Sequence, residues 1–127
     1  MTSANLLTGW LAILAAILSG AVGGLFFYRD DWMGGYNSYR RRLARLGHVA
    51  FAGMGFLNIA FAISASSLNL GRSILEIASA SLIVAAVTMP VCCFLAAWRK
   101  PLRQLFPIPV LATLTGILAI LTGWRGR

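Results

Sequence analysis

The chain has 127 residues, enough for one domain, and a net charge of +8 that comes from eleven basic and three acidic residues. Apolar residues make up 59% of it and charged residues only 11%, whereas about 25% of a typical soluble domain is charged. A soluble fold of this size could not bury so much apolar surface, so we expect lipid to be the solvent of this chain.

Four long apolar segments follow one another along the chain, separated by short polar connections. They cover residues 5–28, 47–70, 74–98 and 105–124. Each has about the 20 residues that a helix needs to cross the hydrocarbon core. Continuous apolarity argues against barrel strands, which alternate apolar and polar residues. These features predict an all-α integral membrane protein, a single domain over residues 1–127 that folds as an up-and-down bundle of four transmembrane helices.

The first segment, residues 5–28, is uncharged, and no basic residue precedes it. A cleaved signal peptide begins with basic residues and has a shorter apolar stretch, so we expect this segment to be retained as a span. Small residues recur in it at every fourth position, which lets two helix backbones approach closely. They are Ala12, Ala16, Gly20 and Gly24, and the fourth segment has a similar pattern in Ala112, Gly116, Ala119 and Gly123. Packing inside the bundle is the favoured role, and contact with another subunit or a second copy is the alternative.

Basic residues are concentrated in two of the three connections. They are Arg29, Arg40, Arg41, Arg42 and Arg45 in the loop of residues 29–45, and Arg99, Lys100 and Arg103 after the third segment. Because basic residues favour the cytoplasmic side of a membrane, both loops are expected there, with the N and C termini outside. The expected location is a bacterial inner membrane.

The arginines of the first loop, Arg40, Arg41, Arg42 and Arg45, are candidates for two kinds of contact. Anionic lipid head groups attract basic residues beside a membrane, and an acidic partner protein would be attracted to the same charges. Contact with membrane lipids is the favoured role. Nucleic acid is not an expected partner, because the charge lies in short connections between apolar segments. Ser38, just before these arginines, has the side chain of a helix N-cap.

The second segment has a polar face on which small and polar residues recur at helical spacing. The face consists of His48, Ala52, Gly55, Asn58, Ala62 and Ser66. Polar groups inside a membrane face the interior of a bundle or a protein partner. Asn58, near the middle of the span, is therefore expected to form a hydrogen bond across a helix interface.

His48 is the only histidine and the one candidate ligand for a cofactor. Histidine is a common axial ligand of haem, and the small residues near it would let a flat macrocycle approach. Since a lone histidine supplies one axial ligand, a tetrapyrrole would need Met54 or Met89 as the second, a partner chain, or a five-coordinate pigment. The favoured alternative is a histidine that forms a hydrogen bond and helps to fix the packing of the helices.

The third segment carries Glu76 near its start, with Arg72 four residues earlier on the same helix face. The two can form an ion pair at the membrane surface, which is the favoured role. The alternative is a carboxylate that binds a proton or a cation in a small transporter. Further along, Pro90 is expected to kink the helix, and the adjacent Cys92 and Cys93 are expected to be unpaired core residues.

An enzyme is not expected, because the sequence has no metal-ligand spacing, no phosphate-binding loop and no Ser–His–Asp set. The leading hypothesis is a non-catalytic subunit of a larger membrane complex, with an energy-transducing complex as the favoured kind. The second is an electron-transfer or pigment protein that binds a tetrapyrrole through His48. The third is a small oligomeric transporter or channel that uses Glu76.

Overall fold

The computed structural model describes residues 2–124, and every regular element in that range is a helix. The long helices are α1 (Thr2–Phe26), α2 (Tyr39–Ser64), α3 (Arg72–Trp98) and α4 (Pro107–Gly123), and two short 3-10 helices, η1 (Trp32–Gly34) and η2 (Lys100–Leu105), lie in the connections. Four helices are long and apolar enough to cross a membrane, when η2 and α4 are counted as one. The prediction of an all-α chain with four such helices is confirmed.

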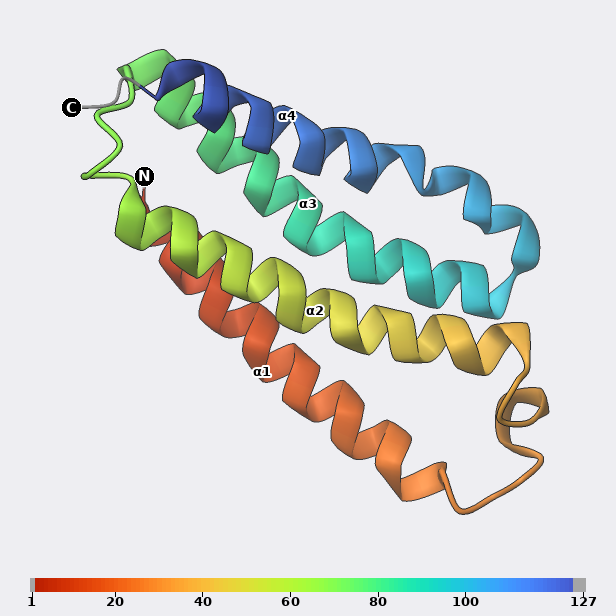
Figure 1. Cartoon of the computed structure of the whole chain (residues 1–127). Helices are drawn as coiled ribbons and strands as arrows, with labels where there is room; N and C mark the ends of the chain where they lie inside the picture. Colours follow the sequence, from red (N-terminus) through yellow and green to blue (C-terminus); the bar gives the residue numbers. More distant parts are fainter. Residues whose placement is uncertain (1, 125–127) are drawn as a thin grey trace.

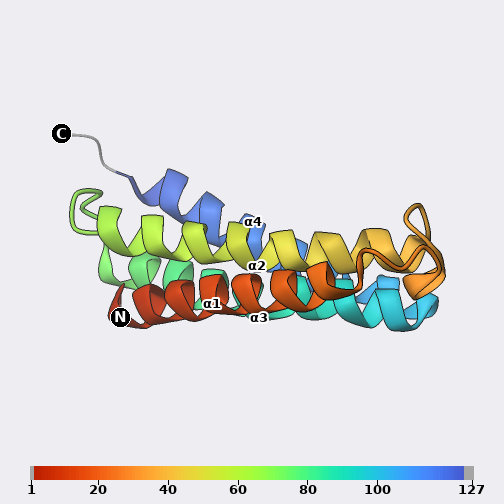
Figure 2. The ribbon, with the colours of Figure 1, turned by 90° about the horizontal axis from the view of Figure 1, so that it is seen from below.

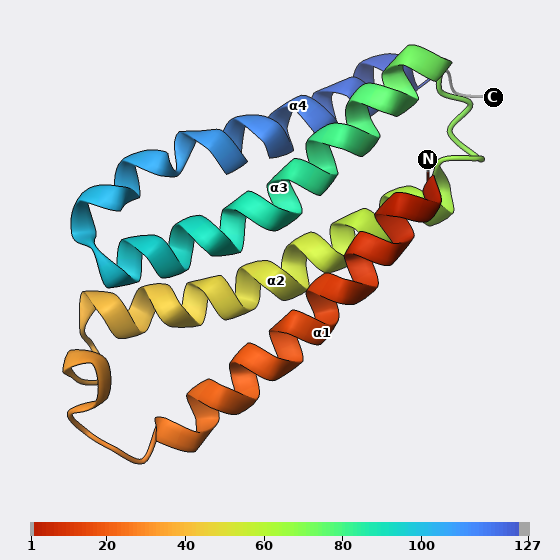
Figure 3. The ribbon, with the colours of Figure 1, turned by 180° about the vertical axis from the view of Figure 1, so that it is seen from behind.

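Successive helices run antiparallel and lie side by side in chain order (Figures 1 and 3). α2 packs against both α1 and α3, α4 packs against α3, and α1 reaches α3 over a smaller area. In the view from below, α2 is offset to one side of α1 and α3, so the helices do not lie in one plane (Figure 2). The two basic connections therefore lie at one end of the molecule, which we call the basic end, and the connection between α2 and α3 lies at the other.

The basic stretch before the second span is partly helical. Ser38 is the N-cap of α2, with an extended backbone and a side-chain oxygen that accepts a hydrogen bond from the backbone N–H of Arg41 at 3.2 Å. This cap starts the helix at Tyr39, as the sequence indicated at Ser38, so residues 39–45 of the basic stretch form its first two turns. Charge marks where the hydrocarbon ends, whereas the cap sets where the helix begins.

Two glycines meet where α1 and α2 cross. A Cβ atom added to Gly9 would lie 2.8 Å from the carbonyl oxygen of Gly55, and one added to Gly55 would lie 2.9 Å from the oxygen of Gly9. Ala12 and Ala16 are buried on the same side of α1. Small residues let the backbones approach in this way, and from this crossing α1 and α2 diverge toward the basic end (Figure 1).

The remaining core lies on both sides of α3. One buried cluster joins Phe61 of α2 and its C-cap residue Ala65 to Ala78 and Leu82 of α3, and part of α4 packs against it. Gly116 of α4 lies against Leu82, because an added Cβ would come within 2.9 Å of that side chain. A second cluster joins Met54 of α2 to α3 through buried alanines.

Two further residues predicted to affect helix packing are Gly123 in α4 and Pro90 in α3. An added Cβ at Gly123 would lie 2.6 Å from the Ile74 side chain, so this glycine also allows close approach of α4 to α3. Pro90 is buried inside α3, which continues as one helix from Arg72 to Trp98. The kink expected at Pro90 stays a prediction.

Candidate functional site

A groove opens between α1 and α2 at the basic end, where these two helices diverge. Its volume is about 380 Å³. We call it the α1–α2 groove. It is lined by Leu18, Ser19, Gly20, Val22, Gly23 and Phe27 of α1 and its C-terminal turn, Trp32 and Met33 of η1, Arg41, Ala44, Arg45 and His48 of α2, and Phe94 of α3. Most of this surface is apolar, and the charged groups come from two turns of α2.

His48 lies in this groove, partly buried between the two helices. Its Nδ1 is 3.2 Å from the Oγ atom of Ser19 on α1, within hydrogen-bond distance. Its ring fills the space beside Gly20, because a Cβ atom at Gly20 would lie 2.5 Å from the Cε1 atom of His48. His48 therefore contacts the small-residue stripe of α1.

Arg41 is almost completely buried, with 2% of its surface exposed. Its Nη2 donates to the carbonyl oxygen of Phe27 at 3.0 Å, and its Nη1 donates to that of Arg29 at 3.4 Å. Phe27 and Arg29 follow the last turn of α1, where the negative end of the helix dipole attracts a cation. The guanidinium also lies 4.8 Å from the centre of the Phe27 ring and 5.6 Å from those of Trp32 and Tyr36.

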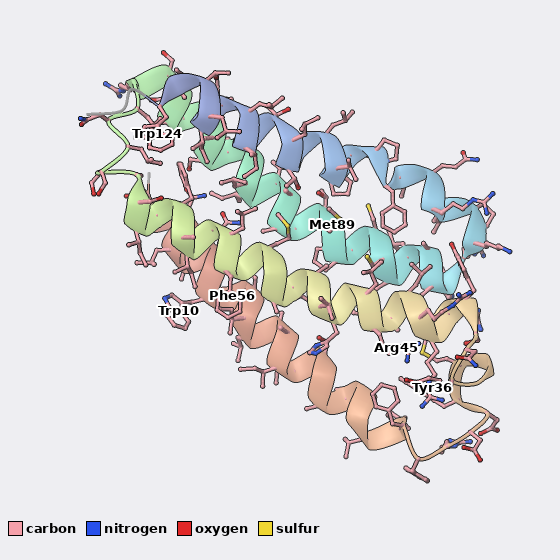
Figure 4. The ribbon with its side chains drawn as sticks, in the orientation of Figure 1. Trp10, Tyr36, Arg45, Phe56, Met89 and Trp124 are labelled. Carbon is pink, nitrogen blue, oxygen red and sulfur yellow. The ribbon has the colours of Figure 1, made fainter. Side chains whose placement is uncertain are left out.

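The other three arginines of the group point to different surroundings. Arg45 is partly buried, donates to the carbonyl of Tyr36 at 3.3 Å and lies 4.5 Å from the centre of its ring (Figure 4). Arg40 reaches the C-terminal end of α3, where it donates to the carbonyls of Ala97 and Trp98 at 3.1 and 3.2 Å. Arg42 is exposed. Only Arg41 and Arg45 of the four line the groove.

Neither methionine suggested as a second tetrapyrrole ligand lines the groove. Met54 is buried in the cluster between α2 and α3, and Met89 packs against that cluster. The methionine that does line the groove is Met33, in η1, where its φ of 52° places it in the left-handed region. Met33 could not be predicted from the sequence, because nothing in the local sequence relates η1 to His48.

A second group of polar residues lies buried between α1, α2 and α3, away from the basic end. Asn5 Nδ2 donates to Asn58 Oδ1 at 2.8 Å and to the carbonyl of Ser79 at 3.2 Å, and the hydroxyl of Ser79 donates to Asn5 Oδ1. Asn58 Nδ2 donates to the carbonyls of Met54 at 2.9 Å and Leu82 at 3.0 Å. Every amide hydrogen of the two asparagines therefore has an acceptor. A fully paired network of this kind is typical of helix packing inside a membrane.

Asn5 and Ser79 were not singled out from the sequence. The signal was a polar residue in the first apolar turns, but its partners are 53 and 74 positions away. Gly24, which was singled out, lies in open space, because an added Cβ would meet no atom within 4 Å.

Glu76 lies at the opposite end of α3 from the basic end. Its Oε1 is 3.1 Å from the Nε of Arg72, with both side chains largely accessible. The helix order keeps this ion pair apart from His48. Among residues 2–124 no three His, Cys, Asp or Glu side chains come together as metal ligands, and Cys92 and Cys93 are unpaired and buried.

Comparison with protein-family models, with curated proteins and with solved structures finds no match to the chain.

Proposed function

We propose that the protein is a non-catalytic subunit of a larger membrane assembly, inserted with its basic end in the cytoplasm. The observation that supports a partner is the position of α4, which packs against α3 and not substantially against α1 or α2. In a closed four-helix bundle each helix has two neighbours. Here most of the surface of α4 is open, and its large apolar side chains Ile108, Leu111, Leu114, Leu118 and Leu121 are exposed.

The position of the charged residues supports the proposed orientation. Both basic connections lie at one end of the molecule, and that arrangement agrees with a cytoplasmic location for basic residues. Alkaline phosphatase fused to the C terminus in a bacterial host should be active, and green fluorescent protein fused there should be dark. The reverse result would contradict the orientation with both termini outside.

Photo-crosslinking from α4 tests the subunit hypothesis directly. A benzoylphenylalanine residue at position 114 replaces an exposed side chain, whereas at position 117 it replaces Ile117, which packs against the internal core. We expect irradiation of membranes to give one adduct of defined mass from position 114 and none from position 117. Adducts to lipid alone, together with a monomer after extraction in mild detergent, would exclude the subunit role.

Tetrapyrrole binding is a second candidate, favoured by the presence of His48 and Met33 in the same groove. Histidine and methionine together ligate haem in electron-transfer proteins, and the space over Gly23 is open. An absorption spectrum of the purified protein tests this candidate. A Soret or pigment band that is lost in His48→Ala supports it, and a spectrum without such a band excludes it.

A further inference from the structure

The charges of the α1–α2 groove are unbalanced. Arg41 and Arg45 line it, and among the described residues that line it there is no Asp or Glu. The two ion pairs in residues 2–124 are Arg29 with Asp31 and Arg72 with Glu76, so neither groove arginine has a carboxylate partner. A buried guanidinium without a counter-charge is unfavourable unless an anion lies nearby.

The polarity of the groove changes along its length. Arg41 and Arg45 lie toward the basic end, where the chain leaves the expected hydrocarbon region. About two turns beyond Arg41 along α2, at the level of His48, the walls include Gly20 of α1 and Phe94 of α3. A molecule that fits both parts has an anionic head and an apolar chain.

We propose that the α1–α2 groove binds one anionic phospholipid. Its phosphate lies beside Arg45, an acyl chain runs between α1 and α2 past Gly23 toward His48, and the buried charge of Arg41 adds to the attraction. Arg41 is almost completely buried and contributes its charge, because its guanidinium is already held by carbonyls and aromatic rings, whereas Arg45 is partly exposed and can donate to the phosphate directly. Basic pockets between transmembrane helices at the cytoplasmic side favour anionic head groups.

The groove is built so that an acyl chain can enter it. An added Cβ at Gly23 would have Phe27 as its nearest neighbour, at 4.0 Å, so the space over this glycine is open. A leucine side chain at position 23 would occupy that space. The adjacent Gly24 does not line the groove and has no atom within 4 Å of an added Cβ, so Gly24→Leu is a matched control of the same size on the same helix.

A matched pair of arginine variants tests the end of the groove that would hold the lipid head group. Arg45→Gln removes a cation that lines the groove, and Arg42→Gln removes an exposed cation from the same turn of α2 that does not line it. Both variants change the net charge equally. A difference between them reports the groove and not the general attraction of a basic surface for anionic lipid.

The test uses the full chain in vesicles of equal parts phosphatidylcholine and phosphatidylglycerol, extracted in mild detergent and analysed by native mass spectrometry. We expect one phosphatidylglycerol retained per chain, in preference to phosphatidylcholine. Arg45→Gln should lower retention about fivefold, the effect of one cation beside an anionic head group. Gly23→Leu should also lower it, and both control variants should retain the lipid as the unaltered chain does.

Equal retention of the two lipids would overturn the proposal, and so would an equal loss in Arg42→Gln and Arg45→Gln. A quinone, a fatty acid or a tetrapyrrole found in the groove of protein from native membranes, in place of phospholipid, would overturn it as well. Arg45→Gln and Gly23→Leu alter different walls of the groove, so either variant carries the test if the other does not fold.

Discussion

The side-chain amide of Asn5 on α1 donates a hydrogen bond to that of Asn58 on α2, across 2.8 Å. Both side chains are fully buried, and Ser79 of α3 completes the contact. Three helices are thus joined by one polar network, in a region where unpaired polar groups are strongly unfavourable.

Removal of either asparagine should weaken the α1–α2 contact, and the effects should be coupled. We expect Asn5→Ala and Asn58→Ala each to lower the free energy of unfolding by about 1–2 kcal/mol. In the double variant the loss should be smaller than the sum by about 0.5–2 kcal/mol, because the second substitution removes a group that the first has already left unpaired. Steric-trapping measurements in bicelles give these values, and strictly additive losses would contradict a direct bond.

The glycine crossing gives a prediction with an internal control. Gly55→Ala places a Cβ 2.9 Å from the backbone oxygen of Gly9, and a backbone atom cannot move aside easily. We expect a loss of about 1–3 kcal/mol in the free energy of unfolding. Gly53→Ala, on the same helix, has no atom within 4 Å of the added carbon and should be neutral or slightly stabilising. Equal effects of the two substitutions would mean that α1 and α2 do not cross at Gly55.

Arg41 should be irreplaceable by lysine. Lysine keeps the charge but lacks the planar fork that reaches the carbonyls of Phe27 and Arg29 together. We expect Arg41→Lys to lower the free energy of unfolding by about 1–3 kcal/mol and to speed amide hydrogen exchange in the last turn of α1. Arg42→Lys, at an exposed position, is the control and should leave both measurements unchanged. Unaltered exchange in Arg41→Lys would contradict the capping role.

The ion pair of Glu76 with Arg72 should contribute little to stability. Both side chains are largely accessible, and exposed pairs of this spacing contribute about 0.3–0.5 kcal/mol. Glu76→Gln should therefore change the free energy of unfolding by less than about 0.5 kcal/mol, and added salt should remove the difference. A loss several times larger would show that Glu76 has a buried partner in the membrane.

The sequence was sufficient to predict the number, type and approximate limits of the long helices, because hydrocarbon thickness and backbone hydrogen bonding leave few solutions for long apolar segments. Hydropathy alone begins the second span at residue 47, whereas the Ser38 side chain indicates the N-cap from which α2 extends through the charged stretch. Caps act locally and independently of hydropathy, so a boundary drawn from charge comes too late.

The residues that line the groove together could not be predicted from the sequence. His48 was recognisable as an unusual residue, but its neighbours Ser19 and Met33 come from other elements. The groove exists because α1 and α2 diverge, and that angle depends on the Gly9–Gly55 contact and on the way Arg41 holds the end of α1. Contacts between positions tens of residues apart leave no local pattern in a single sequence.

The Gly9–Gly55 crossing lies near the start of α1, so most of this helix extends from the crossing toward the basic end. From Gly9 to Phe26 the helix extends for 17 residues, or about 26 Å at 1.5 Å per residue. A rotation of only about 5° about the crossing would move the far end by roughly 2 Å over that length. A change in the angle between α1 and α2 would therefore move the first connection, and with it the basic surface at that end of the molecule.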